Sequence, residues 1–339
     1  MRTPADIIAG ILARNPRAVG RAISLVENGD PRAGEILAAL EDSRVAAATI
    51  LGITGPGGAG KSTLTGQLIG HYRALGRRIG VVAVDPSSPI SGGALLGDRV
   101  RMMAHATDEN VVVRSMATRG RIGGLCAAAG AAVRIMALAG CDPVIIETVG
   151  VGQAEIDVVR LADLTALVMA PGLGDDIQAM KAGLVELADI LVVNKGDHPA
   201  AEALMLEMTP VARERGRALV RTVATEGKGI AELADTATAL AAAQRASGEQ
   251  ARRRQRNREA EAVDWAVELL RPAIRAAIHS AGPGCDPRAT ARAALADLLG
   301  RPSESLPTLS EAAFKPIIPI SPIVESVEAA HGCCSATHA

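Results

Sequence analysis

Residues 48–62 read ATILGITGPGGAGKS, an apolar run followed by a glycine-rich loop that ends in Lys61 and Ser62. The loop matches the phosphate-loop pattern GxxxxGK[ST], and the helix-forming stretch 63–75 comes next. A glycine-rich turn without a ligand is the alternative. The order strand, loop, helix argues against it, because this order brings an anion to a helix N-terminus, where free amides and the helix dipole stabilise it. The stretch predicts a nucleoside triphosphate site.

The loop residues have distinct chemical tasks. Backbone N–H groups of the loop can close around phosphate oxygens, Lys61 can reach the β and γ phosphates, and the Ser62 hydroxyl can ligate Mg²⁺. The loop residues expected to contact the nucleotide are Gly55, Gly57, Gly58, Ala59, Gly60, Lys61 and Ser62.

A second motif indicates which base is bound. Residues 189–197 read DILVVNKGD, a short apolar strand that ends in N-K-x-D. The Asp197 carboxylate can accept hydrogen bonds from N1–H and the exocyclic amine of guanine, neither of which adenine offers there. Asn194 is expected to brace the loop, and the Lys195 stem to lie across the base. A polar cap after a buried strand is the alternative, but ligands bind at the carboxyl ends of strands in such sheets, so we expect GTP rather than ATP.

Composition sets limits on the class of protein. The chain has 339 residues, of which 48% are hydrophobic and 22% charged, enough for one sizeable α/β domain with helical additions. A net charge of −1 gives no general attraction to nucleic acid or to a membrane. Apolar runs stop short of the roughly 20 residues that span a bilayer, and the start MRTP opens no signal peptide. We expect a cytoplasmic protein whose five cysteines are reduced.

The chain divides into regions of different pattern. Residues 1–45 predict an N-terminal arm of short helices broken at Asn15-Pro16 and at Gly29-Asp30-Pro31. In residues 46–244, short apolar strands alternate with helices, which predicts a doubly wound, mostly parallel α/β sheet. The expected strands lie around 49–54, 79–84, 111–115, 143–147, 164–169, 189–194 and 219–223.

The C-terminal part is expected to be helical and then irregular. Residues 245–300 predict a long helix to about Ile278 and a second helix after Pro287. The basic run 252–258 is interpreted as a solvated helix face rather than a nucleic-acid patch, because acidic residues follow and aromatic residues are missing. The Pro-rich tail 301–339 is expected to be poorly ordered. Its side chains His331, Cys333, Cys334 and His338 could hold a metal, but loose terminal residues are the preferred interpretation.

Charged, glycine-rich segments follow expected strands at 85–99, 147–155 and 171–183, so each should face the phosphates. Mg²⁺ prefers oxygen ligands and keeps several waters, which suits Ser62 with water-held carboxylates from Asp85, Asp98 and Glu147. Helix capping is the alternative for Asp98 and Asp175. Gly150 can supply the backbone N–H that senses a γ-phosphate.

Together these segments resemble the methylmalonyl-CoA mutase-associated GTPases of the MeaB/ArgK type, over roughly residues 5–300. The resemblance rests on DPSSP at 85–89 with 92–99, RSMATRG at 114–120, ETVGVGQ at 147–153 and PGLGDDIQ at 171–178. It implies a homodimer whose P-loop GTPase domain (46–244) lies between the N-terminal arm (1–45) and a C-terminal helical dimerisation extension (245–300). It also implies GTP-dependent loading, gating and protection of an adenosylcobalamin-dependent acyl-CoA mutase.

The resemblance assigns roles to matching positions. It assigns phosphate and metal binding to Lys61, Ser62 and Thr63, the metal cluster to Asp85, Asp98 and Glu147, guanine binding to Asn194, Lys195 and Asp197, and contact with the base to Val223 and Ala224. The three charged segments correspond to switch loops. Gly196 departs from the usual alanine and is expected only to loosen the guanine loop.

Catalysis is expected to be slow without a partner, because no catalytic base is evident. Lys61, which reaches the β and γ phosphates, and Glu147 of the metal cluster are counted among the catalytic residues, and a water-orienting residue is expected from Gln153, Gln178 or the partner. In the third switch loop, Asp175, Asp176, Gln178 and Lys181 are the groups that we expect a mutase to bring into the nucleotide site.

Other functions fit these motifs less well. The fused form of this system carries an Asp-x-His-x-x-Gly run, which Asp197-His198-Pro199 does not fit, so the chain should act on a mutase in trans. A nickel-metallochaperone GTPase is the alternative, but it needs Cys and His residues next to a switch. A kinase or transport ATPase needs ATP preference, against which N-K-x-D argues.

Overall fold

The computed structural model describes residues 3–40, 43–85, 108–117, 124–148, 154–173, 183–281 and 286–300. The chain divides into two compact units, Met1–Glu268 and Leu269–Ala339. Along the described residues, no helix combines the length and the apolar character that crossing a membrane requires.

The described strands of the first unit form one parallel sheet, as the sequence predicted. They are β1 (Ile50–Thr54), β2 (Ile79–Asp85), β3 (Val111–Ala117), β4 (Val144–Thr148), β5 (Leu164–Met169), β6 (Ile190–Val193) and β7 (Ala218–Arg221). Their order is β3-β2-β4-β1-β5-β6-β7, and every neighbouring pair is parallel. The central strands β1, β4 and β5 are buried along their whole length and are mostly apolar, as expected for parallel strands covered on both faces.

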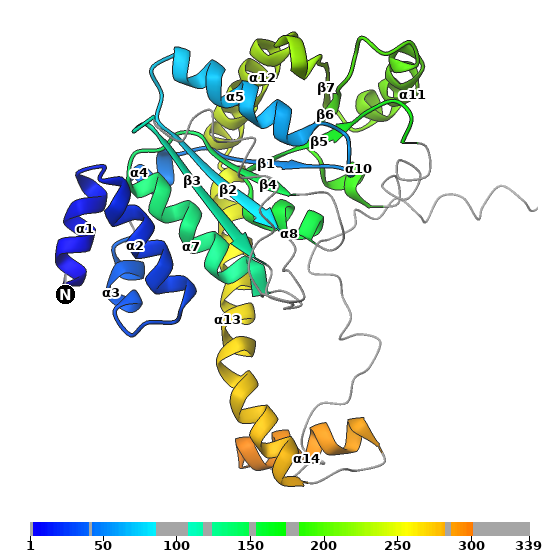
Figure 1. Ribbon diagram of the computed structural model, residues 1–339. Coiled ribbons are helices and arrows are strands. Elements are labelled where there is room, and N and C mark those ends of the chain that lie inside the picture. The colour runs from blue at the N-terminus through cyan, green and yellow to red at the C-terminus, as the bar shows by residue number, and fades with distance from the viewer. Residues whose placement is uncertain are drawn as a thin grey trace, which may run out of the picture. The chain divides into compact units, whose positions relative to one another are not determined.

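Helices cover both faces of this sheet (Figure 1). The helices that follow the N-terminal arm are α5 (Lys61–Ala74), α7 (Gly124–Leu138), α8 (Ala154–Leu161), α10 (Leu184–Leu187), α11 (Ala201–Glu214), α12 (Ile230–Ala246), α13 (Glu249–Ala281) and α14 (Pro287–Leu299). Helices α5 and α12 share a buried cluster with Ile53 and Val168, on one face. Helices α7 and α11 pack against the opposite face, α7 on Val82 and α11 on Met169. The sheet is therefore doubly wound, as expected.

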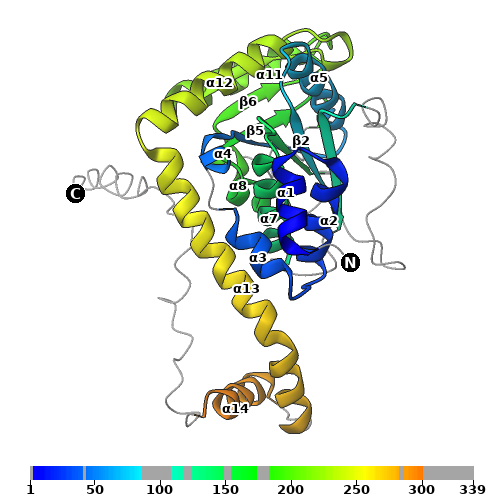
Figure 2. The ribbon, with the colours of Figure 1, turned by 90° about the vertical axis from the view of Figure 1, so that its left-hand side faces the viewer.

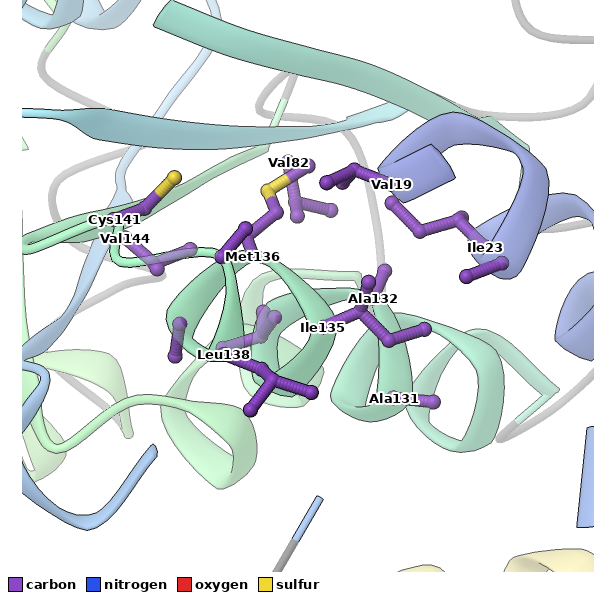
Figure 3. Packing of buried hydrophobic residues seen from close by; sticks show 14 of the residues in the cluster. Val19, Ile23, Val82, Ala131, Ala132, Ile135, Met136, Leu138, Cys141 and Val144 are labelled. Carbon is purple, nitrogen blue, oxygen red and sulfur yellow. The ribbon is translucent and has the colours of Figure 1, made fainter. Parts of the chain in front are cut away.

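Short helices α1 (Pro4–Leu12), α2 (Pro16–Glu27), α3 (Ala33–Ala38) and α4 (Ser43–Ala47) precede the sheet. The expected break at Asn15-Pro16 separates α1 from α2, and the Asn15 side chain accepts the Arg17 N–H at 2.9 Å, which caps α2. Figure 3 shows Val19 and Ile23 of α2 and Val82 of β2 converging on α7 around Ile135. The arm therefore shares one hydrophobic core with the sheet.

Two arginines of the basic run 252–258 dock α13 on the sheet, near the starts of strands β5 and β6. Arg254 donates to the Asp163 carboxylate at 2.7 and 2.6 Å, and Arg253 pairs with Asp189 at 3.0 Å. These arginine side chains are only 15% and 17% exposed. The expectation of a solvated helix face is wrong for both, because each neutralises an aspartate that precedes a buried strand. Figure 2 shows α13 following α12 and passing α4, whose Val45 and Ala46 carbonyl oxygens accept hydrogen bonds from Arg254.

The described part of the second unit is helical and obeys simple local rules. Helix α14 starts after Asp286, whose carboxylate accepts the Arg288 N–H at 2.9 Å, and Pro287 takes the first helical position. Gly300, with φ of 59°, ends the helix in the left-handed conformation. The predicted helix after Pro287 is confirmed.

Candidate nucleotide-binding site

The motif residues meet at one edge of the sheet because all strands run parallel. Gly55 follows β1, Glu147 lies near the end of β4, Asn194 follows β6, and Val223 lies two residues beyond β7. The strand register places Ile53 beside Glu147. This carboxyl edge is where open α/β sheets bind ligands.

The phosphate loop is shaped by glycines that no other residue could replace without strain. Gly55 has φ of 140°, and a Cβ there would lie 2.1 Å from the Val168 carbonyl oxygen. Gly60, with φ of 91°, is the residue directly before α5. The helix therefore starts at Lys61, two residues before the expected start. Left-handed backbone at these positions favours glycine. The loop thus leads directly into a helix N-terminus, the setting that binds phosphate.

Lys61 lies folded back across the loop. Its Nζ donates to the carbonyl oxygens of Gly55 and Pro56, both at 2.8 Å, and the residue is 5% exposed. Ser62 is half-buried and Thr63 exposed, in the first turn of α5. The chain therefore presents a buried ammonium group and a hydroxyl group on adjacent residues behind a glycine loop.

Asn194 ties the phosphate loop to the guanine motif. Its Nδ2 donates to the Ala59 carbonyl oxygen at 2.9 Å, while its Oδ1 accepts from the Thr222 hydroxyl at 3.0 Å and from the Ala224 N–H at 3.1 Å. Asn194 is 2% exposed, so these bonds replace water at a buried amide. A Cβ on Gly60 would lie 2.4 Å from Asn194 Nδ2, which adds a second reason for glycine there. Asn194 thus bonds to both neighbouring segments, and its role in nucleotide binding stays a prediction.

Lys195 and Asp197 are both exposed beside this buried brace. Lys195 has φ of 54°, an uncommon conformation for a residue with a side chain. Such backbone strain costs on the order of 1 kcal/mol and clusters at binding sites. Val223 and Ala224 are 8% and 3% exposed, and the Val223 N–H donates to the Lys228 carbonyl at 3.0 Å. Contact of these residues with a base stays a prediction.

Gly196 does not loosen this loop, contrary to expectation. The Arg221 side chain fills the space in which a Cβ would lie, and Arg221 Nε donates to the Gly196 carbonyl at 3.0 Å. The Gly196 N–H donates to the Thr222 carbonyl at 2.9 Å. The loop is therefore held on both sides of this glycine.

The donor set at the edge fits Mg²⁺. Ser62 offers a hydroxyl oxygen, and Glu147 is a carboxylate that is only 3% exposed at the end of a central strand. Asp85 ends β2, the strand next to β4. Hard oxygen donors of this kind are what Mg²⁺ takes. Among the described residues, no group of three or more His, Cys, Asp or Glu side chains is arranged to hold a metal by itself, so the water-mediated set stays a prediction.

Several expected site residues lie outside the described residues. These are Asp98, Gly150, Gln153, Asp175, Asp176, Gln178 and Lys181, together with the tail 301–339 and its His331, Cys333, Cys334 and His338.

With the phosphate loop and guanine motif joined through Asn194, the comparisons with known proteins agree with the geometry. A family model described as methylmalonyl Co-A mutase-associated GTPase MeaB matches residues 19–279. The chain belongs to this family. It is similar to a probable GTPase of Mycobacterium tuberculosis, with 40% identity over 273 residues that cover 76% of this chain and 79% of the relative. It is therefore a P-loop GTPase that binds guanine nucleotide and hydrolyses GTP.

Two further likenesses are to a mammalian relative and to a solved structure. The mouse mitochondrial methylmalonic aciduria type A homolog is 38% identical over 215 residues, which cover 60% of this chain and 52% of that protein. A solved structure described as LAO/AO transport system kinase superposes with a TM-score of 0.63 at 25% identity, covering 87% of this chain and 97% of that one.

Sequence reasoning missed three arginines that make tertiary contacts. Arg221 contacts the guanine loop at Gly196. Arg253 and Arg254 anchor α13 at the amino ends of β6 and β5, the edge of the sheet opposite the motifs. One signal was present: Asp163 and Asp189 each stand directly before an apolar strand, where a buried carboxylate needs a cationic partner.

Proposed function

We propose that the protein is a cytoplasmic G-protein chaperone that uses GTP to gate cofactor loading into an adenosylcobalamin-dependent acyl-CoA mutase in trans, and that protects this mutase. The family match over residues 19–279 supports the mutase partner. The observation that carries the nucleotide part is the Asn194 side chain of the guanine motif, which bonds the phosphate loop at Ala59 and the segment after β7 at Ala224. A nucleotide bound to both motifs would then contact segments that Asn194 already joins.

In this proposal, GTP binding changes the hydrogen-bond partners of Lys61. The ammonium group leaves the Gly55 and Pro56 carbonyls for the β and γ phosphate oxygens, where its charge stabilises the transition state of phosphoryl transfer. Ser62, with Asp85, Asp98 and Glu147, would hold Mg²⁺, which neutralises phosphate charge when bound. Gly150 and Gln153 would sense the γ-phosphate and orient water. Because no general base is evident from the sequence motifs, hydrolysis is expected to be slow until the mutase engages the loop with Asp175, Asp176, Gln178 and Lys181.

The proposal includes a homodimer formed by the C-terminal extension, residues 245–300. In the first unit, Val263 and Val267 of α13 are 58% and 49% exposed, and a spacing of four places them on one helix face. In the second unit, Leu269 and Leu299 are 75% and 55% exposed. Large exposed apolar groups in such numbers are typical of surfaces that a partner covers. Light scattering of Val263→Glu with Val267→Glu tests this: a monomer supports it, and an unchanged dimer contradicts it.

Single-turnover GTP hydrolysis, with and without the cognate mutase, tests the chaperone function. The mutase should raise the rate of the wild type, and Lys181→Ala and Asp175→Ala should blunt that increase while leaving GTP affinity nearly intact. Glu214→Ala, an exposed residue on α11, is the control. Stimulation of equal size in every variant would exclude the switch role. If no cobalamin mutase stimulates the wild type, or if ATP replaces GTP, the proposed function is wrong.

A further inference from the structure

The residue between Lys195 and Asp197 in the guanine motif is glycine for a reason that lies outside the loop. Gly196 does not have the positive φ that would require glycine. A Cβ at this position would instead lie 2.7 Å from Arg221 Cγ and 2.8 Å from Arg221 Nε, distances that real Cβ contacts do not show. The Thr222 carbonyl oxygen would be 3.1 Å away. What excludes a side chain is therefore chiefly Arg221.

Arg221 is the last residue of β7, and its guanidinium lies on the guanine loop. Nε donates to the Gly196 carbonyl oxygen at 3.0 Å, and a second nitrogen of the same group donates to the same oxygen. The remaining nitrogen reaches Glu202, in the first turn of α11, at 3.1 Å. Hydrogen bonds from a charged donor to a carbonyl are stronger than neutral ones.

This contact reaches Asp197 through the backbone. The carbonyl of Gly196 and the N–H of Asp197 belong to one planar peptide group. Holding the Gly196 carbonyl in one direction therefore fixes the orientation of this peptide group. The group ends at the Asp197 Cα, to which the Asp197 side chain is attached. The Gly196 N–H, held by Thr222 at 2.9 Å, fixes the preceding peptide in the same way.

We propose that Arg221 is a positioning residue for guanine recognition. It holds the Gly196 carbonyl so that the exposed Asp197 carboxylate is aimed at N1–H and the exocyclic amine of the base, and Gly196 is the partner that leaves room for it. This inference rests on the proposed role of Asp197 in binding guanine. The competing explanation is that Arg221 and Glu202 form only a surface ion pair, since their side chains are 45% and 67% exposed, and such pairs contribute little.

Dissociation constants for GDP and IDP separate the two explanations, because IDP lacks the exocyclic amine. Arg221→Ala should weaken GDP binding more than IDP binding. The preference for GDP over IDP should fall by roughly tenfold, the effect of misplacing one hydrogen bond to a charged group. Arg221→Lys, which keeps one donor, should fall between Arg221→Ala and the wild type. Glu202→Gln, which removes only the ion pair, should keep the full preference.

A double-mutant cycle tests the pairing with Gly196. Gly196→Ala alone should lower the GDP preference, because the new methyl group displaces Arg221. When Gly196→Ala is added to Arg221→Ala, the GDP preference should fall almost no further, since coupled residues give non-additive effects. Additive losses, or losses of GDP and IDP affinity in equal proportion, would overturn the inference. So would a changed melting temperature with an unchanged GDP preference in Arg221→Ala and Arg221→Lys.

Asp197→Asn distinguishes failure of this inference from failure of the site. If Asp197→Asn loses GDP preference and Arg221→Ala keeps it, Arg221 does not position the carboxylate, and the guanine site stands. If Asp197→Asn keeps the preference, the guanine site and the inference both fall.

Discussion

Arg254 and Asp163 form a buried ion pair in which Nε lies 2.7 Å from one carboxylate oxygen and a terminal nitrogen lies 2.6 Å from the other. Asp163 is 1% exposed and also accepts the Ile50 N–H, at the start of β1, at 2.9 Å. One carboxylate thus joins α13 to the beginnings of the strands that lead to the phosphate loop and to the third switch segment.

Arg254→Ala should destabilise the first unit strongly and leave the nucleotide site intact. Removing one partner of a buried pair leaves the other charge uncompensated, which costs about 3 kcal/mol or more. Arg256, whose side chain is 54% exposed and pairs with Glu249, is the matched control, and its change to alanine should cost within about 0.5 kcal/mol. Urea unfolding of GDP-free protein measures both. Equal destabilisation by the two substitutions would refute the docking role of Arg254.

Lys61→Ala should abolish tight GTP binding. It removes the side chain that neutralises phosphate charge in a loop otherwise lined by backbone amides. It also removes two hydrogen bonds to the Gly55 and Pro56 carbonyls, so a thermal melt of the nucleotide-free protein must accompany the calorimetric titration. A folded variant with wild-type GTP affinity would contradict the phosphate-loop assignment.

Asp197→Asn should transfer preference from guanine toward xanthine. The amide places donors where the carboxylate accepted two hydrogen bonds, so the guanine donors lose their acceptor at a cost of about 1–3 kcal/mol. Xanthine carries a carbonyl in place of the amine and pairs better with the amide. Competition between GTP and XTP for the variant measures this change. Full retention of GTP preference would show that Asp197 does not read the base.

The parts of the fold that sequence predicts well are those encoded by neighbouring residues. The phosphate loop is one, because Gly55 and Gly60 supply backbone conformations that the turn itself requires. Arg221 was not predictable, since its partner Gly196 is 25 positions away and the chain pattern at 196 permits alanine. Arg254 belongs to a run that looks solvated, and only its contact with Asp163, 91 positions away, shows otherwise.

The Cys141 thiol should resist alkylation in the folded protein. Burial raises its pKa to about 11, and the nearby Arg78 guanidinium only partly opposes that rise. Since the thiolate is the reactive form, the thiol remains protonated and enclosed at pH 8. Peptide-resolved mass spectrometry after iodoacetamide treatment should find Cys141 unlabelled in native protein and labelled in urea. Rapid labelling at pH 8 without denaturant would show that the segment between α7 and β4 opens.

Asn194→Ala should weaken nucleotide binding without touching the base-reading carboxylate. The substitution leaves the Ala59 carbonyl, the Thr222 hydroxyl and the Ala224 N–H without their partner in a buried place, at about 1–3 kcal/mol for each group that water does not reach. Both loops should therefore become mobile together, so GDP and IDP should lose affinity in similar proportion, unlike in Asp197→Asn. Asn194→Asp is the companion variant, because it keeps the acceptor for Thr222 and Ala224 but replaces the donor to Ala59 with a carboxylate oxygen that the Ala59 carbonyl repels. It should therefore bind nucleotide at least as weakly as Asn194→Ala. If it binds as the wild type does, the link to Ala59 does not support nucleotide binding.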